Sequence, residues 1–101
     1  MSQPYLQVIA HYHAQPGAQE QVGALLARLA EHTRTEPANL YYEYFQSGSD
    51  PCHFVILEKY RDMHGLDEHR QTAHFQAIGI GQIIPLLARR EVESHMVTPD
   101  S

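Results

Sequence analysis

The sequence predicts a single α+β domain whose elements follow the order β-α-β-β-α-β. Three observations predict this order: strand-like alternation near both ends of the chain, a helical period after the first strand, and two strand-like segments that meet at a turn. Helices that cover one face of such an antiparallel sheet give the ferredoxin-like arrangement. We expect one domain over residues 1–101, with a core at about 5–97 and a short C-terminal tail.

The first two predicted elements are a strand and an amphipathic helix. Alternation over Tyr5–Ala14 places four side chains on one strand face, namely Leu6, Val8, Ala10 and Tyr12. After a Pro-Gly turn, apolar residues recur at the i, i+3, i+4, i+7 spacing, which predicts a helix over about residues 18–34. Glu36 precedes Pro37 and is therefore pushed out of the helical region, so the helix ends before it.

The middle of the chain predicts a β-hairpin. Residues 40–46 are rich in aromatic side chains and predict a second strand, and residues 53–60 predict a third. Between them lies a dense run of turn-forming residues, Ser47-Gly48-Ser49-Asp50-Pro51. Because the connection is short, we expect the two strands to pair antiparallel.

The remainder of the chain predicts two short helices and a last strand. Asp62 suits the N-cap of a helix that ends at residue 69, and Thr72 can cap a second helix. Two glycines and a proline interrupt that second segment, so we expect a broken helix over residues 73–87. The alternation returns over residues 91–97 and predicts the fourth strand.

Both faces of the predicted sheet carry apolar side chains. The third strand places Phe54 and Ile56 on one face and Val55 and Leu57 on the other. Helices can cover only one face, and an uncovered apolar face is rare on a monomer. We therefore predict a homodimer formed by sheet-on-sheet packing about a two-fold axis.

Charge and composition exclude several classes of partner. The formal net charge is -5 and no stretch collects the basic residues, so nucleic acid is not an expected partner. The most apolar stretch, residues 83–88, is far shorter than the roughly 20 residues that a membrane span needs, so no membrane partner is expected. Cys52 is the only cysteine and the first ten residues lack a secretory pattern, which predicts a cytoplasmic location.

Three short motifs resemble the antibiotic biosynthesis monooxygenase (ABM) domain family. They are Glu36-Pro37-Ala38-Asn39-Leu40-Tyr41-Tyr42, then Glu58-Lys59-Tyr60-Arg61-Asp62, then His69-Arg70-Gln71-Thr72-Ala73-His74-Phe75. Their order and spacing are those of the family, and the resemblance covers roughly residues 5–97. Two positions depart from the family pattern: Ala38 stands at its usual glycine and Tyr60 at its usual tryptophan.

The resemblance implies a dimeric α+β barrel and an activity. Characterised members oxidise phenols, quinols or polyketide aromatics with O2 and need neither a metal nor an organic cofactor. The expected partners are therefore a second copy of the chain, a small aromatic substrate and O2, with no cofactor. The haem-degrading branch relies on a tryptophan, and this sequence has none, which disfavours that branch.

A cofactor-free oxygenase needs a base that converts the substrate into its anion, and histidine is the natural base near neutral pH. His69 is the first candidate, because it ends the short helix where the family motif places its histidine. His74 is the second, although five residues of unbroken helix would turn it away from His69. Glu58 shares a strand face with apolar residues and could orient either imidazole. Each of the three also has a purely structural alternative, as a helix-end, core or strand-end residue.

Aromatic residues near these groups could form a pocket for a flat ring. The candidates for substrate contact are Tyr60, Tyr42, Tyr44, Phe75 and His11. Core or dimer-interface packing is the alternative role for the tyrosines. His11 and His13 share one strand face, but no third ligand with metal-site spacing accompanies them, so no metal site is predicted.

Two other functions remain open at this point. The same base and donors would serve an isomerase acting on a small carbonyl compound, as in the branch of the family that isomerises a phosphorylated autoinducer sugar. A dimeric ligand-binding module without turnover is the other alternative. An open apolar cavity beside His69 would favour the enzymatic functions over a filled scaffold.

Overall fold

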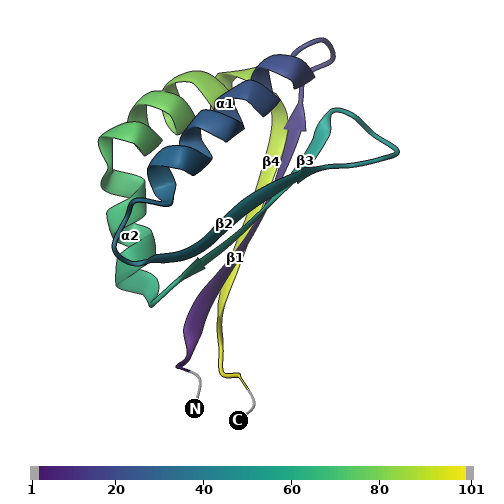
Figure 1. Cartoon of the computed structure of the whole chain (residues 1–101). Helices are drawn as coiled ribbons and strands as arrows, with labels where there is room; N and C mark the ends of the chain where they lie inside the picture. Colours follow the sequence, from purple (N-terminus) through teal and green to yellow (C-terminus); the bar gives the residue numbers. More distant parts are fainter. Residues whose placement is uncertain (1–2, 100–101) are drawn as a thin grey trace.

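A four-stranded antiparallel sheet forms one layer of the structure, and the helices form the other (Figure 1). The computed structural model describes residues 3–99. In chain order the elements are β1 (Tyr5–Ala14), α1 (Gln19–Thr33), β2 (Asn39–Gln46), β3 (His53–Tyr60), α2 (Met63–Gln71), η1 (Phe75–Ile83), η2 (Ile84–Leu86) and β4 (Leu87–Val97). The strand order in the sheet is β2-β3-β1-β4, which confirms the predicted β-α-β-β-α-β fold. Of the predicted C-terminal tail, residues 100 and 101 lie outside the described residues.

The helices cover the face of the sheet that the alternation predicted. Every second residue of β1 is buried, starting at Leu6, and the same holds for β3, starting at Phe54. The two strands pair so that Val8 stands opposite Glu58, and β2 places Tyr42 on the other side of Glu58. Side chains that stand opposite one another in a ladder share a face, so Glu58 points into the layer between sheet and helices.

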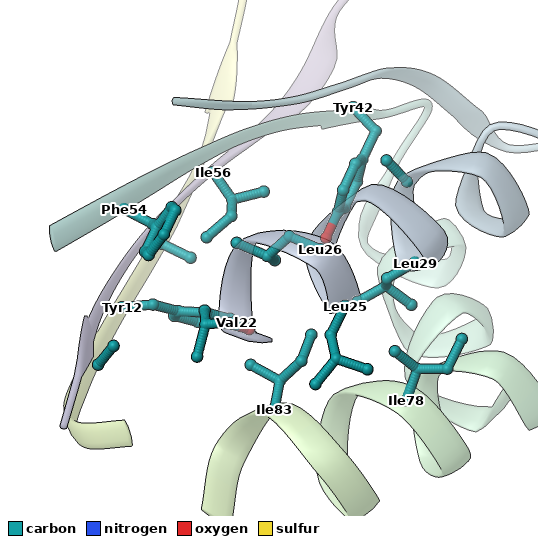
Figure 2. Close-up of a cluster of buried hydrophobic side chains, with 13 residues drawn as sticks. Tyr12, Val22, Leu25, Leu26, Leu29, Tyr42, Phe54, Ile56, Ile78 and Ile83 are labelled. Carbon is teal, nitrogen blue, oxygen red and sulfur yellow. The ribbon is translucent and has the colours of Figure 1, made fainter. Parts of the chain in front are cut away.

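The main core lies between α1, the sheet and η1. Figure 2 shows Val22, Leu25, Leu26 and Leu29 of α1 among side chains of the strands, with Ile78 and Ile83 of η1 on the other side. These four α1 residues are the ones that the helical period selects, and all are buried. Burial of this stripe, rather than capping, holds the helix, since its N-cap residue Ala18 makes no side-chain hydrogen bond.

Replacing Leu26 with Ala should lower the free energy of unfolding by about 2–5 kcal/mol, because it leaves a cavity in a close-packed core. Leu26 is fully buried, with 0% of its surface exposed. Chemical denaturation followed by circular dichroism measures the change. Arg28→Ala on the exposed side of α1 is the matched control and should change the value by less than about 0.5 kcal/mol. Equal effects of the two substitutions would contradict the packing described above.

The helical segment between β3 and β4 is interrupted, as the sequence predicts. Asp62 caps α2 by accepting a hydrogen bond from the Gly65 N–H at 2.9 Å. Thr72 is extended, with φ -67° and ψ 152°, and its hydroxyl accepts from the Phe75 N–H as the helix restarts. The restarted segment is π-helical over η1 and 3-10 helical over η2, which contains Pro85. The chain therefore changes direction between α2 and η1.

The fourth strand is longer than predicted. It begins at Leu87 rather than at residue 91, and it pairs with β1 along its length. The first residues of β4 do not alternate, so their sequence carries no strand period. Pairing with β1 holds them in the sheet instead, through a register shift between His13 and Ala14.

The opposite face of the sheet has no helix over it (Figure 1). It carries Tyr41 and Phe45 of β2, with 39% and 48% of their surfaces exposed, beside the half-buried Val55 and Leu57 of β3. The apolar second face that the sequence predicts is thus present.

Within residues 3–99, no helix combines the length and hydropathy needed to cross a bilayer.

Candidate functional site

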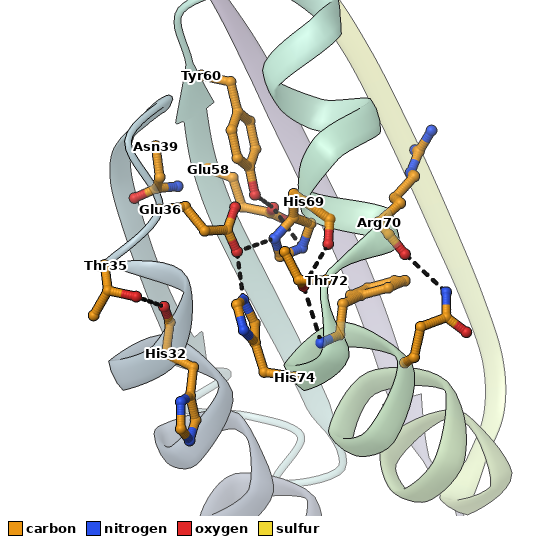
Figure 3. Close-up of polar contacts among 12 residues, drawn as sticks. His32, Thr35, Glu36, Asn39, Glu58, Tyr60, His69, Arg70, Thr72 and His74 are labelled. Atoms are coloured by element: carbon orange, nitrogen blue, oxygen red, sulfur yellow. Dashed lines mark hydrogen bonds and ion pairs between the residues drawn. The ribbon is translucent and has the colours of Figure 1, made fainter.

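The interruption at Thr72 brings His69 and His74 onto the same carboxylate. His69 lies in the last turn of α2, and His74 lies in the first turn of the helix that restarts after Thr72. The Nδ1 of His69 lies 2.9 Å and the Nε2 of His74 lies 2.5 Å from the Oε2 of Glu36 (Figure 3). In a continuous helix, two side chains five residues apart are about 500° apart around the axis, which is one full turn plus about 140°, so they would point in different directions. The change of direction at Thr72 is therefore what assembles the pair.

Glu36 is held by the loop that joins α1 to β2. Its N–H donates to the carbonyl of Thr33, and the guanidinium of Arg61 donates to the carbonyl of the next residue, Pro37, at 2.6 Å. Gly65 of α2 packs against this loop so closely that an added Cβ would lie 2.8 Å from the Cβ of Ala38. Contacts from the end of α1, from Arg61 just after β3 and from α2 thus fix the loop that carries Glu36 between the two histidines.

Sequence reasoning missed Glu36 as a site residue. From the sequence, Glu36 is only the residue before Pro37 that ends the first helix and opens a family motif. The contact with His69 spans 33 residues of sequence, and the contact with His74 spans 38. Helix and strand periodicities relate only residues that are close in sequence, so they cannot predict such a contact. The motif itself, an acidic residue before a proline at the entry to a strand, was the available signal.

The hydrogen bonds to Glu36 determine the tautomers of both histidines. An ionised carboxylate only accepts, so the Nδ1 of His69 and the Nε2 of His74 each carry a proton. Neutral His69 is then left with a lone pair on Nε2. Burial raises the pKa of the Glu36 carboxyl, but the hydrogen bonds from His69 and His74 outweigh it and hold the pKa below its ordinary value. Glu36 is thus an ionised group inside the protein, with 10% of its side chain exposed.

Glu58 lies on the other side of the His69 ring. Its Oε1 accepts a hydrogen bond from the Tyr60 hydroxyl at 2.7 Å and lies 3.9 Å from the Nε2 of His69. Burial raises the pKa of Glu58, and the charge of His69 and the Tyr60 hydrogen bond offset this only in part. Burial and the nearby Glu58 also raise the pKa of Tyr60, which keeps its proton. Glu36, not Glu58, therefore orients His69, since it binds Nδ1 directly.

A cavity of about 280 Å³ is lined by His69 and by Glu58, whose Oε1 lies 3.9 Å from the Nε2 of His69. It lies between the layer of α2 and η1 and the strands β1 and β4, and His69, Glu58 and Phe75 are among its lining residues. Most of its wall is apolar, formed by Val8, Ala10, Leu66, Ile80, Ile84 and Val92. The volume is close to the lower end of the roughly 300–1,000 Å³ range of small-molecule sites. The predicted base and an apolar pocket are thus adjacent.

The remaining predicted residues do not line this cavity. Tyr60 and Tyr42 are buried behind His69, with ring centroids 5.4 and 6.3 Å from the His69 ring. Tyr44 packs against the α1 core at another part of β2. His74 contacts Glu36 and stacks on His32 at 5.6 Å, away from the cavity wall. The tyrosines therefore support the site from behind and do not form its wall.

His11 was expected to contact substrate, and the structure places it on the wrong face of the sheet. It lies on the face without helices, where its Nδ1 is 2.9 Å from the Nε2 of His53. The His53 ring also stacks on His13, with centroids 4.4 Å apart. Strand parity separates odd-numbered residues of β1 from Tyr12 and Val8, which line the cavity. His11 is therefore not part of this site.

Glu36, His69 and His74 could also be considered as metal ligands, because their ligand atoms all lie within 4.8 Å of one another. Ligands on a tetrahedral zinc ion lie roughly 3.3 Å apart, since each is about 2.0–2.1 Å from the metal. Here the Glu36 oxygen is 2.9 and 2.5 Å from the two nitrogens, which are direct hydrogen-bond distances. An ion would have to displace two protons and widen the cluster. The arrangement fits a doubly hydrogen-bonded carboxylate better than a metal centre.

Glu36 should stabilise the fold only while it is ionised. Its folded pKa lies below the ordinary value of 4.5, so its contribution is complete above 4.5 and is lost as the pH falls through the folded value. The difference in unfolding free energy between wild type and Glu36→Gln should therefore be largest above pH 4.5 and should shrink as the pH falls below it. Chemical denaturation at a series of pH values measures it. A difference that does not change with pH would contradict the ionised state of Glu36.

The fold and the sequence place the chain in a known class of small domains. The chain belongs to the antibiotic biosynthesis monooxygenase family, whose model matches residues 6–79. The resemblance carried by the three sequence motifs is thereby confirmed.

Individual relatives agree with this assignment. The chain is 33% identical over 67 residues to "Putative monooxygenase YcnE" of Bacillus subtilis, which is 66% of this chain and 70% of the relative. It is 35% identical to "Putative monooxygenase Rv0793" of Mycobacterium tuberculosis over 67% of this chain and 66% of the relative. The solved structure of Rv0793 superposes with a TM-score of 0.80 over 96% of both chains. A crystal structure described as antibiotic biosynthesis monooxygenase is 32% identical, with a TM-score of 0.82 over 95% of this chain and 99% of that one.

Proposed function

We propose that the protein is a cofactor-independent monooxygenase that oxidises a quinol-like aromatic with O2. One observation carries the proposal: a histidine whose Nδ1 is bound to a largely buried carboxylate lines a mainly apolar cavity, which leaves Nε2 as the nitrogen available to a substrate. The proposed reaction converts a quinol and O2 into a hydroxyquinone and water. The quinol supplies the electrons, one oxygen atom enters the product and the other leaves as water.

The first step is removal of a hydroxyl proton by His69. A phenol of pKa about 10 facing an imidazole of pKa about 6.5 makes this transfer uphill by about 3.5 units, or roughly 5 kcal/mol. The Glu36 carboxylate stabilises the imidazolium that forms, because it already accepts the Nδ1 proton at 2.9 Å. His74 donates to the same oxygen and holds the carboxylate in place. Glu36 and His74 are positioning residues in this proposal.

The resulting phenolate needs a hydrogen-bond donor within the apolar wall. Glu58 lines the cavity, and burial raises the pKa of its carboxyl group. A neutral carboxyl group in an apolar site can donate a hydrogen bond to an oxyanion. We assign this role to Glu58, with Tyr60 orienting it through the 2.7 Å hydrogen bond. Phe75 supplies an aromatic surface for the substrate ring.

Oxygen uptake by chelator-treated, metal-free protein tests the proposal. Reduced menadione is the quinol, and an oxygen electrode together with mass analysis of the product gives the stoichiometry. We expect one O2 consumed per quinol, faster than the autoxidation measured without protein. A rate equal to that blank would contradict the proposal. Product formed at full rate without O2 from a carbonyl substrate would instead favour the isomerase alternative, and ligand binding without turnover would favour the non-catalytic module.

We also propose that the protein is a homodimer that buries the sheet face without helices. That face presents Tyr41, Phe45, Val55 and Leu57, an apolar surface that a second copy can cover. Leu57→Lys should shift the protein to a monomer at micromolar concentration, because it buries a charge in the interface. Gln21→Lys, on the exposed side of α1, is the control and should remain dimeric. Analytical ultracentrifugation decides, and a monomeric wild type would contradict the proposal.

A further inference from the structure

Two arginines line the cavity together with the proposed base. Arg70 comes from α2 and Arg90 from β4, and both line the same cavity as His69. Within residues 3–99, neither has a carboxylate oxygen within 4.0 Å, whereas Arg34 pairs with Glu43 and Arg89 with Glu91. The cavity wall therefore includes two cationic groups without an ion-pair partner in the described part of the chain.

The two arginines line the cavity from opposite layers. Arg70 follows His69 directly on α2 and projects away from Glu36 (Figure 3). Arg90 stands opposite Tyr12 in the ladder of β1 and β4, so it points to the helical side of the sheet. Burial raises the pKa of Tyr12, while the charges of Arg90 and Arg70 both oppose this increase. Both guanidinium groups are thus within electrostatic reach of the same cavity residue.

The local charge is opposite to that of the whole protein. The chain has a formal net charge of -5, so its overall field repels anions. Glu58 is the acidic residue of the cavity wall, and it lies at the inner end beside His69. Two exposed guanidinium groups at the opening give a small positive site in front of an apolar pocket. Such a site can attract and orient an anionic group while an attached ring enters the pocket.

We propose that the substrate is a hydroxylated aromatic that carries a carboxylate, and that Arg70 and Arg90 bind this carboxylate at the mouth of the cavity. The inference rests on the proposed function, since the ring hydroxyl is then directed to the Nε2 of His69. Guanidinium matches a carboxylate through two parallel hydrogen bonds, which gives orientation as well as affinity. The apolar wall receives the ring, and Phe75 lies beside it.

Binding of two unreactive ligands tests the inference without requiring turnover. The probes are 2-naphthoate and its neutral isostere 2-naphthamide, titrated into the wild-type protein by calorimetry. We expect the naphthoate to bind about tenfold more tightly, as hydrogen bonds between charged groups allow. Arg70→Gln and Arg90→Gln should each reduce naphthoate affinity about tenfold and leave naphthamide affinity unchanged. Arg28→Gln, on the exposed side of α1 and outside the cavity wall, is the matched control and should change neither.

The possible results separate this inference from the proposed function. Equal affinity for the two ligands, no measurable binding of either, or a naphthoate preference that survives both arginine substitutions would each overturn the inference. Oxygen uptake with a neutral quinol would still support the monooxygenase in any of these cases. Conversely, selective naphthoate binding in a protein that consumes no O2 with any quinol would support the anion site and overturn the monooxygenase. Added salt should weaken naphthoate binding more than naphthamide binding.

Discussion

Replacing His69 with Gln should lower kcat for quinol oxidation by about 10²–10⁴-fold, the usual contribution of a general base. Glutamine is similar in size and can donate to Glu36, but it offers no basic nitrogen to the cavity. His69 is buried, with 3% of its surface exposed, so thermal melting must be measured alongside activity. His64→Gln, on the exposed side of α2, is the control and should keep full activity. A folded His69→Gln variant that oxidises quinol at the wild-type rate would remove His69 from the mechanism.

Replacing Glu36 with Gln should have the second largest effect on turnover, a loss of about 10²-fold or more. The neutral amide oxygen accepts from the two imidazoles less strongly than the carboxylate does, and it carries no charge to stabilise the imidazolium of His69. His69 would then be free to carry its proton on Nε2, the wrong nitrogen for a base. The effect should fall on kcat more than on KM, because Glu36 does not line the cavity.

The pH profile distinguishes this positioning role from a merely structural one. Without the carboxylate, the imidazolium of His69 is less stabilised. The acidic limb of the kcat/KM profile, where protonation of the base removes activity, should therefore move to lower pH. A loss of activity with an unchanged pH profile would indicate disturbed folding instead. Glu68→Gln, in the exposed i, i+4 pair with His64, should leave both the rate and the profile unchanged.

The fold could be predicted because its strands and first helix carry strong periods. The limits of β1 and β3 agree with the predicted ranges, since alternation runs through both from end to end. The start of β4 at Leu87 could not be predicted in this way, because its first residues are placed by pairing with β1. The interruption at Thr72 could be predicted from capping chemistry, and it turned out to be the feature that assembles the site.

The site could be predicted only in part. A local motif identifies His69 and His74, but the sequence predicts Glu58 of the third strand as their acidic partner, whereas Glu36 binds both of them. Strand parity shows which face a residue occupies but not how deeply it lies, so Tyr42 and Tyr60 were expected in the pocket wall and are buried behind it. His11 is an odd-numbered residue of β1, and the alternation of that strand by itself places it on the face opposite the helices.

The protonation state of His69 tests the central claim of this account most directly. Long-range nitrogen–proton correlation spectra of the ¹⁵N-labelled protein near neutral pH report which ring nitrogen carries the proton. We expect neutral His69 to be protonated on Nδ1, bound to Glu36, with Nε2 free to accept, and we expect Glu36→Gln to abolish this preference. A neutral His69 protonated on Nε2 in the wild-type protein would leave the cavity without a base and contradict the account.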